Sequence, residues 1–233
     1  MSIRKDSIET KKRILAVCVR LFLEQGYKQT SISQIIEETG IARGSFQNLF
    51  PTKDAVLLEL VDPMLCGQFG TVRSNSDDGL LPVCTYALET AIQLTFTEMN
   101  ENLRELYTEI YSLPETAEYI YLHTTTGLKK IFGSYSPDYA ESDFYEFGIG
   151  TSGMMRSYIA RPCDTYFTLE RKLERFLTAA MRMYKVPEEE QKQVLQYISS
   201  IDIRKSATET MKNLFAVLEK NFDFKMTGSE SGT

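Results

Sequence analysis

The chain has 233 residues and a formal net charge of −6, and its four cysteines include no CxxC pair. This length allows one large or two modest domains. Without closely spaced cysteines or a histidine near them, neither a zinc site nor a disulfide framework is indicated, and we expect no metal and no cofactor. No stretch reaches the roughly 18 consecutive apolar residues of a membrane span. We therefore expect a cytoplasmic protein that does not bind membranes.

The charge is divided unevenly along the chain. Residues 1–60 carry nine basic and seven acidic side chains, whereas the remainder carries 17 basic and 25 acidic ones. The acidity therefore belongs to a part of the chain that need not approach an anionic partner. The basic residues from Arg4 to Arg13 form either a solvated helix face or a set of phosphate contacts.

Two short helices separated by a glycine are predicted after a first helix over about residues 14–23. Ser31 and Gln34 have the capping-box spacing, in which the serine oxygen accepts from a backbone amide and the glutamine reaches back to the cap. Gly40 supplies the positive φ that ends a helix. The next helix turns outward a guanidinium, a hydroxyl and two carboxamides, which can contact base edges. These belong to Arg43, Ser45, Gln47 and Asn48.

This order of elements resembles the N-terminal domain of the TetR family of one-component bacterial transcription regulators, over roughly residues 10–60. The matching residues, in order and spacing, are Glu24, Gln25, Gly26, Tyr27, Thr30, Thr39, Gly40, Ile41, Gly44, Ser45, Phe50, Thr52, Lys53 and Asp54. Two tyrosines common in the family are replaced by Gln47 and Leu49. We expect a DNA-binding surface that consists of Thr30, Ser31, Arg43, Gly44, Ser45, Gln47, Asn48, Thr52 and Lys53.

Individual roles can be assigned to three of these residues. Lys53 is expected to bind a phosphate, because it lies where the next helix begins and free backbone amides favour an anion. Gln47 and Asn48 either pair with the edge of an adenine or replace the family's tyrosines as phosphate donors.

The chain beyond residue 60 is predicted to be helical, which gives an all-α fold. The helix that begins at Thr52 should stop or kink at Asp62-Pro63, and residues 67–79 should form a loop. Further helices are expected over 82–100, 102–113, 114–132, 137–159, 165–184 and 187–222, the last with a break near 201–202. We divide the chain into a helix-turn-helix domain (1–60), a ligand-binding and dimerisation domain (61–226) and a disordered tail (227–233).

Twelve of the thirteen tyrosines lie in this second part, and they predict a cavity rather than plain core because a buried hydroxyl needs a partner. His123 is either a satisfied core imidazole or a polar anchor in that cavity. We expect the lining to include Phe96, Tyr107, Tyr111, His123, Phe147, Thr151, Met155 and Tyr158. Few charges and many aromatic residues favour a small, largely apolar or aromatic ligand.

Residues 148–153 match G-x-G-x-x-G, but apolar residues at helical spacing flank them. The dinucleotide fingerprint requires a strand before the glycines, so this match is rejected. The glycines allow either close approach of another helix or space for a ligand.

Dimerisation is expected, because one short recognition helix covers too few base pairs to single out a genomic site. The apolar stripe of helix 165–184 suits a helix-helix seam, and the resemblance assigns a homodimer interface to this helix and to about residues 203–222.

Together these observations predict a transcription regulator, a repressor that binds a palindromic double-stranded DNA operator as a dimer and is released by a small-molecule effector. The alternative is a helical ligand-binding or interaction protein of the same fold without specific DNA binding. An enzyme is not expected, because no nucleophile, base or metal set is clustered. The cysteines are expected to be buried apolar residues, with a thiol switch at Cys66, Cys84 or Cys163 as the alternative.

Overall fold

The structure is a computed structural model that describes residues 2–75 and 81–226, and the side chains of residues 6–65 and 81–226. Within these ranges it has eleven α-helices, one short 3-10 helix and no strand. The predicted all-α fold is therefore confirmed. None of the described helices combines the length and the hydropathy that crossing a membrane requires.

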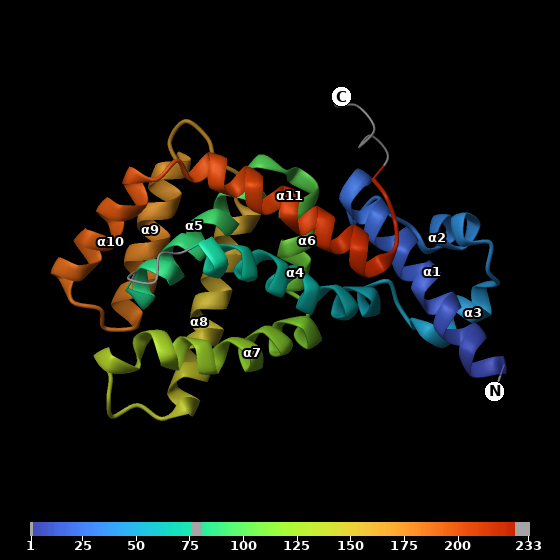
Figure 1. Cartoon of the computed structure of the whole chain (residues 1–233), viewed down its shortest axis with the longest axis horizontal. Helices are drawn as coiled ribbons and strands as arrows, with labels where there is room; N and C mark the ends of the chain where they lie inside the picture. The colour runs from blue at the N-terminus through green and yellow to red at the C-terminus, as the bar shows by residue number, and fades with distance from the viewer. Residues whose placement is uncertain (1, 76–80, 227–233) are drawn as a thin grey trace.

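The three N-terminal helices form one end of an elongated molecule (Figure 1). They are α1 (Ser2–Gln25), α2 (Ile32–Thr39) and α3 (Arg43–Leu49). Each contributes apolar side chains to a small core, among them Ile14, Ile35 and Phe46, which are fully buried. The predicted helix-turn-helix is thus present, with α1 as its supporting helix.

The helix α4 (Asp54–Asn75) connects this end to the rest of the molecule without interruption. Thr52 caps it, since its hydroxyl accepts from the Ala55 amide at 3.2 Å. The helix continues through Pro63, so the expected stop does not occur there. Residues 67–75 are helical, so the expected loop is wrong for them; residues 76–79 of that loop and residues 227–233 of the expected tail lie outside the described residues. The packing of α4 along α11 and α5 outweighs the weak local signal of a Ser/Asn/Gly-rich sequence.

The remaining helices surround α5 (Pro82–Met99), which is buried along most of its length. They are α6 (Glu101–Ile110), α7 (Pro114–Phe132), α8 (Glu141–Ala160), α9 (Leu169–Met183), α10 (Glu188–Ser200) and α11 (Ile203–Phe222), with the 3-10 helix over Gly133–Tyr135. Prolines begin α5 and α7 as predicted, and the expected break near residue 201 separates α10 from α11. By contrast, the helix expected to begin at Pro137 begins four residues later, at Glu141.

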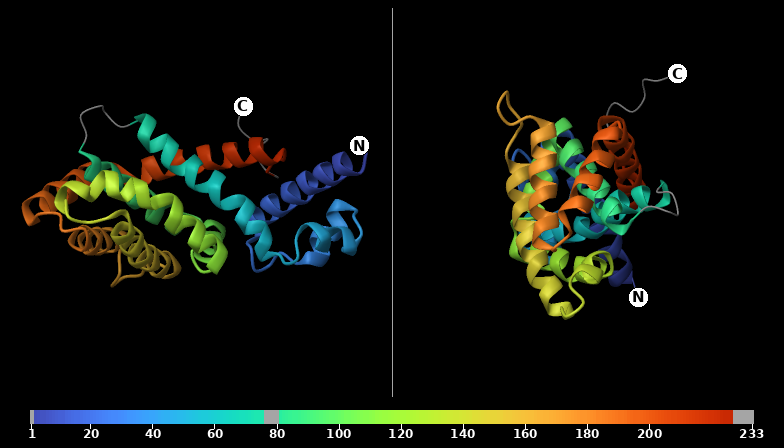
Figure 2. Two further views of the ribbon diagram at one scale, coloured as in Figure 1. Left: turned by 90° about the horizontal axis from the view of Figure 1, so that it is seen from below. Right: turned by 90° about the vertical axis from the view of Figure 1, so that its left-hand side faces the viewer.

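Two long contacts hold the halves together. The helix α11 runs along α4 and α5, and its C-terminal end reaches α1 (Figures 1 and 2). The helices α7 and α8 pack on each other, with α7 below α5 and α8 running upward toward α5 in the view of Figure 1, and α4 packs on α7. The helix α6 also packs on α1. The N-terminal domain is therefore anchored to the larger domain through α11 and α6 as well as through the continuous helix α4.

Candidate functional site

The turn between α2 and α3 has the geometry that the sequence predicts. Ser31 caps α2, accepting from the Gln34 amide at 3.1 Å. Gly40 has φ +65°, and its amide donates to the last carbonyls of the helix. Only half of the expected capping box forms, because the Gln34 side chain bonds to Gln25 and Glu38 instead of reaching back to the cap.

Four polar side chains of α3 are exposed to solvent, as expected for a recognition helix. They are Arg43, Ser45, Gln47 and Asn48, while Phe46 on the same helix is buried. Gly44 is also exposed, and a Cβ at that position would meet nothing within 4 Å. The helix has no side-chain cap, since Ala42 occupies the capping position. A guanidinium, a hydroxyl and two carboxamides thus face solvent from a helix that can lie in a DNA groove.

Thr30 lies differently from the other residues predicted to contact DNA. It is 1% exposed, and its hydroxyl donates to Gly26 O at 2.8 Å. Its side chain therefore stabilises the turn after α1 and is not available for the expected contact with DNA. Ser31 and Thr52 remain at the surface, where both act as helix caps.

Lys53 is half-buried, and its ammonium group binds the protein itself. It donates to Tyr27 O at 2.7 Å and to Thr30 O at 2.8 Å, and it lies 4.0 Å from the centre of the Tyr27 ring. Burial lowers the pKa of Lys53, although nearby carboxylates oppose the shift. Burial also raises the pKa of Tyr27, whose hydroxyl donates to Asp54. Through these hydrogen bonds Lys53 connects the α1–α2 turn to the start of α4, independently of any contact it makes with DNA.

Other basic residues of this domain differ in whether they have an acidic partner. Lys11 pairs with Glu59 at 2.8 Å, and Arg20 pairs with Glu24 and Glu38. Arg43, Lys12 and Arg13 are exposed and have no ion-pair partner among the described residues. These three are the cations most available to phosphate. The side chains of Arg4 and Lys5 lie outside the described residues.

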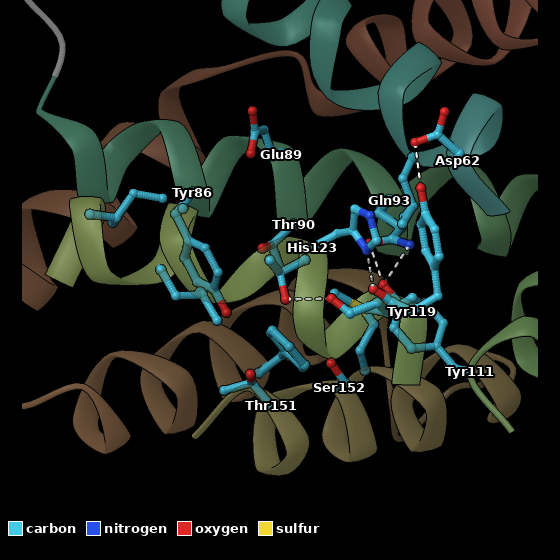
Figure 3. A pocket seen from close by; sticks show the side chains of 18 residues that line it. Asp62, Tyr86, Glu89, Thr90, Gln93, Tyr111, Tyr119, His123, Thr151 and Ser152 are labelled. Carbon is cyan, nitrogen blue, oxygen red and sulfur yellow. Dashed lines mark hydrogen bonds between the residues drawn. The ribbon is translucent and has the colours of Figure 1, made fainter. Parts of the chain in front are cut away.

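A cavity of about 470 Å³ lies in the larger domain between α4, α5, α7 and α8 (Figure 3). Its lining comprises Asp62, Leu65, Tyr86, Glu89, Thr90, Gln93, Tyr111, Tyr119, Ile120, His123, Thr124, Gly127, Leu128, Ile131, Thr151, Ser152, Met155 and Phe176. This size suits a small organic molecule. Asp62 and Leu65 belong to α4, so the helix that leaves the DNA-facing end also forms part of the cavity wall.

Half of the side chains predicted for this lining reach it. Tyr111, His123, Thr151 and Met155 do so. Phe96 and Tyr107 are instead fully buried in the core, with ring centres 5.3 Å apart. Phe147 packs on Tyr139 and Tyr184, and Tyr158 on Phe167 and Phe176. Helical spacing correctly grouped these residues by helix, but it did not show which side of each helix the cavity occupies.

The lining residues on α4 and α5 were not foreseen; on α5 only Phe96 was predicted, and it is not part of the lining. Tyr86, Glu89, Thr90 and Gln93 line the cavity from α5. A signal existed in the sequence, because a glutamate and a glutamine within an otherwise apolar helix need polar surroundings when buried. Gln93 is 1% exposed and donates to the Tyr111 hydroxyl at 3.2 Å.

Hydrogen bonds connect the cavity wall to the DNA-facing end by two routes. The Tyr119 hydroxyl donates to Asp62 of α4 at 2.7 Å. On the other side α6 places Tyr111 in the wall and holds the α1–α2 turn: Asn102 donates to Leu23 O at 2.8 Å, and Lys28 lies 3.4 Å from Glu109. Gly26 has φ +93°, and a Cβ there would lie 3.0 Å from Glu105. Glycine is therefore required where α6 approaches this turn.

Two of the three glycines of α8 lie where a side chain of another helix approaches closely. A Cβ at Gly150 would meet Met183 of α9 at 3.3 Å, and one at Gly148 would meet Leu128 of α7 at 3.4 Å. Gly153 has no neighbour within 4 Å. None of the three lines the cavity.

The apolar stripe of α9, which was predicted to form a seam between subunits, is buried within the chain itself. Leu173, Phe176 and Leu177 are buried, where α9 packs on α5 and α8. The exposed side chains of α9 are charged, among them Arg171, Glu174 and Arg175. A subunit contact that uses this helix must therefore involve its charged face.

Lys172 interrupts this stripe and is nevertheless 1% exposed. Its ammonium group donates to Glu98 at 2.7 Å and to Arg161 O at 2.6 Å, while the Cys163 amide donates to the other oxygen of Glu98 at 3.0 Å. Burial acts to raise the pKa of Glu98, but these hydrogen bonds and the lysine charge outweigh it and lower the pKa. The loop after α8 is thus fixed to α5 and α9.

The described cysteines are not activated thiols. Burial raises the pKa of Cys18 to about 12, and it also raises the pKa of Cys84 and Cys163. A thiolate is the reactive form, so these three groups are poor nucleophiles at neutral pH. The side chain of Cys66 lies outside the described residues. No group of three or more His, Cys, Asp or Glu side chains in the described part could hold a metal ion.

The fold and these two sites define a class of protein: a helix-turn-helix domain joined by a continuous helix to a larger helical domain that encloses a cavity. Comparison with known proteins agrees. The family model described as "Bacterial regulatory proteins, tetR family" matches residues 14–60. The N-terminal domain is thus similar to that of TetR-family regulators over residues 14–60.

Relatives of known sequence match mainly in this N-terminal region. YuxN of Bacillus subtilis, an uncharacterized HTH-type transcriptional regulator, is 30% identical over 97 residues, which are 42% of this chain and 31% of YuxN. The HTH-type transcriptional regulator EthR of Mycolicibacterium smegmatis is 34% identical over 64 residues, or 28% of this chain and 30% of EthR. The matches span less than a third of these relatives' lengths.

Solved structures extend the likeness of the fold to most of the chain. RolR, crystallised with the ligand resorcinol, has a TM-score of 0.63 at 18% identity, covering 82% of this chain and 95% of RolR. TylP, a TetR regulator from Streptomyces fradiae, has a TM-score of 0.50 at 15% identity, covering 89% of this chain and 98% of TylP. At these identities the likeness shows the fold alone.

Proposed function

We propose that this protein is a transcriptional repressor that binds a palindromic operator as a homodimer and is released by a small, largely aromatic ligand bound in the cavity. One observation carries the proposal: α4 begins beside the exposed recognition helix and ends beyond the cavity, whose wall it helps to form. The match of residues 14–60 to the TetR-family model supports the DNA-binding role, since the relatives that align there are HTH-type regulators. Two recognition helices about one turn of DNA apart supply the required specificity.

The proposed mechanism uses the contacts between the cavity and α4. A ligand can release DNA only to the extent that it binds the released arrangement more tightly. A molecule that contacts Tyr119 changes the environment of its hydrogen bond to Asp62, and one that contacts Tyr111 acts on α6, which holds the α1–α2 turn. Either displacement alters the angle of the helix-turn-helix domain relative to the larger domain.

For the dimer, we propose that the outward faces of α9 and α11 form the contact, because both helices expose charged residues of both signs. Arg171 and Glu174 on α9 and Lys212 and Glu209 on α11 are exposed. Sedimentation at low and high salt tests this arrangement. A salt-sensitive dimer supports it, and a monomer at micromolar concentration contradicts it.

The experiment that tests the function is a fluorescence-anisotropy titration of the full chain with duplex DNA from upstream of its own coding sequence. Specific binding should exceed binding to scrambled duplex by at least about 10³-fold, the lower end of the usual range. The matched control is the Gln47→Ala/Asn48→Ala variant. It should keep the weak, salt-sensitive binding to any duplex and lose the preference for the upstream duplex over the scrambled one.

Equal affinity for both duplexes would instead favour the second candidate, a ligand-binding or interaction protein without specific DNA recognition. The replacement of two family tyrosines by Gln47 and Leu49 is the observation that keeps this candidate in view.

A further inference from the structure

Gly127 lies in the interior of α7 and lines the cavity. Only proline is less favourable than glycine inside a helix, so a glycine at this position calls for a physical reason. Two usual reasons do not apply. Gly127 lacks the positive φ of Gly26 and Gly40, and a Cβ at Gly127 would meet no side chain and no other helix within 4 Å in the described part of the chain. The missing side chain therefore leaves open space.

This open space belongs to the cavity and has large side chains on both sides. Residues four positions apart lie one above the other on a helix. The residues four positions before and after Gly127 are His123 and Ile131, and both line the cavity. Thr124 and Leu128 belong to the same face of α7. At Gly127 the backbone of α7 thus borders the cavity, in a notch between His123 and Ile131.

The cavity is much larger than one aromatic ring. Its volume is about 470 Å³, whereas a cavity of about 150 Å³ holds a benzene molecule. It is also long. Tyr86, Thr90 and Gln93 line it along α5 (Figure 3), and the first and last of these are about 10 Å apart along the helix axis. A ligand with a single ring would fill only about a third of the space.

We propose that Gly127 determines which ligands the cavity accepts, and that the ligand is a planar, largely apolar molecule of two or three fused rings. Its flat face lies on the α7 backbone in the notch, since glycine allows a backbone to approach a ligand closely. Side chains one turn away on either side admit a thin ring system more readily than a bulky saturated one.

The rest of the ring system contacts the apolar part of the wall, which consists of Leu65, Ile120, Leu128, Ile131, Met155 and Phe176. The inference rests on the proposed function in taking this cavity as the effector site.

The test compares alcohols that share one polar group and differ in their rings. The full-length protein is titrated calorimetrically with benzyl alcohol, 2-naphthalenemethanol and decahydro-2-naphthalenemethanol. The naphthalene compound should bind at least about tenfold more tightly than benzyl alcohol, because it buries more apolar surface. It should also bind at least about threefold more tightly than the saturated compound, which has two rings but is not flat. Equal or tighter binding by either of the other two, or no binding by the naphthalene compound, would overturn the proposal.

Variants locate the selectivity at Gly127. Gly127→Leu fills the notch with a good helix former, so the affinity for 2-naphthalenemethanol should fall at least about tenfold while the melting temperature does not fall. Gly153→Leu is the matched control, because a Cβ at Gly153 would also meet nothing within 4 Å and Gly153 is not part of the lining. This variant should bind the probe as the native chain does.

Gly127→Ala provides a second, smaller change that remains informative if the leucine variant does not fold. It should raise the melting temperature, since alanine favours the helix, and should lower the affinity for 2-naphthalenemethanol at least about threefold. A folded Gly127 variant with the native affinity would show that the ligand does not approach the backbone there, and would contradict the proposal.

These measurements use no DNA, so they fail or succeed independently of the proposed function. A protein that selects the flat two-ring probe through Gly127 but does not prefer its upstream DNA keeps this inference and loses the repressor assignment. A protein that binds its operator but shows no such selection does the reverse.

Discussion

The two halves of the molecule differ in how their functional residues are positioned. In the helix-turn-helix domain the exposed groups lie on one seven-residue helix, and Gly40 and the Ser31 cap fix where the preceding helix begins and ends. In the larger domain the cavity is assembled from helices that are distant in sequence, and buried polar contacts such as Lys172–Glu98 hold them. The first site is a local feature of the chain, and the second exists only when the helices pack.

The largest expected effect concerns the buried ion pair of the larger domain. Lys172→Met should lower the free energy of unfolding by about 3 kcal/mol, because Glu98 and Arg161 O lose a buried cation and Glu98 keeps only the more distant Arg104, at 3.8 Å. Chemical denaturation measures this loss. The double variant Lys172→Met/Glu98→Gln removes both charges and should recover much of the stability. If the single variant is as stable as the native chain, packing rather than the ion pair holds this region.

The same pair predicts a dependence on pH. The pKa of Glu98 is lowered from its usual value of 4.5, so its contribution to stability is complete above pH 4.5 and is lost as the pH falls through the lower value in the folded protein. The difference in stability between the native chain and the Glu98→Gln variant should therefore shrink below pH 4.5. A difference that stays constant from neutral to acidic pH would contradict this assignment.

In the N-terminal domain, Lys53→Ala should cost about 1–3 kcal/mol of stability, since Tyr27 O and Thr30 O lose a charged donor. The affinity of the Lys53→Ala variant should fall by the same factor for all DNA sequences. Lys12→Ala is the matched control: Lys12 is exposed and unpaired among the described residues, so it should weaken DNA binding without changing stability.

Salt titrations of both variants show how many phosphates each lysine neutralises, with a log-log slope that changes by roughly 0.9 per phosphate. An unchanged slope in Lys53→Ala would mean that this lysine is structural only.

Alanine at Gln47 or Asn48 should have a smaller and more selective effect. If the carboxamide pairs with a base, the preference at one position of each half-site should fall by about 1–3 kcal/mol, with no change in stability, because both side chains are exposed. Binding to a set of singly substituted operators measures this. Uniform weakening across the set would show that the residue contacts phosphate instead.

The smallest effect is a gain in stability. Gly153→Ala should stabilise the protein by about 0.5–1 kcal/mol, because alanine is the better helix former and its Cβ would meet nothing within 4 Å. Gly150→Ala should gain less, since the end of Met183 must move. Thermal unfolding compares the two, and a destabilised Gly153→Ala would indicate that another subunit covers this position.

The N-terminal domain could be predicted from the sequence because its signals are local. The Ser31 cap, the positive φ of Gly40 and the spacing of buried Ile35 and Phe46 each act within a few residues. The same holds for Pro82 and Pro114, which begin helices at the expected positions. Local signals also place Gln47 and Asn48 on the exposed face of α3.

Only the tertiary structure decided where the other side chains point. Lys53 bonds to carbonyls of a turn more than twenty residues earlier in the chain, and Pro63 lies within a helix that packing against α11 maintains. The helix α5 is buried on nearly all sides, so polar residues such as Glu89 and Gln93 are the only indication in its sequence of the side that borders the cavity. For this reason Phe96 is a core residue and Gln93, three positions earlier, is part of the cavity wall.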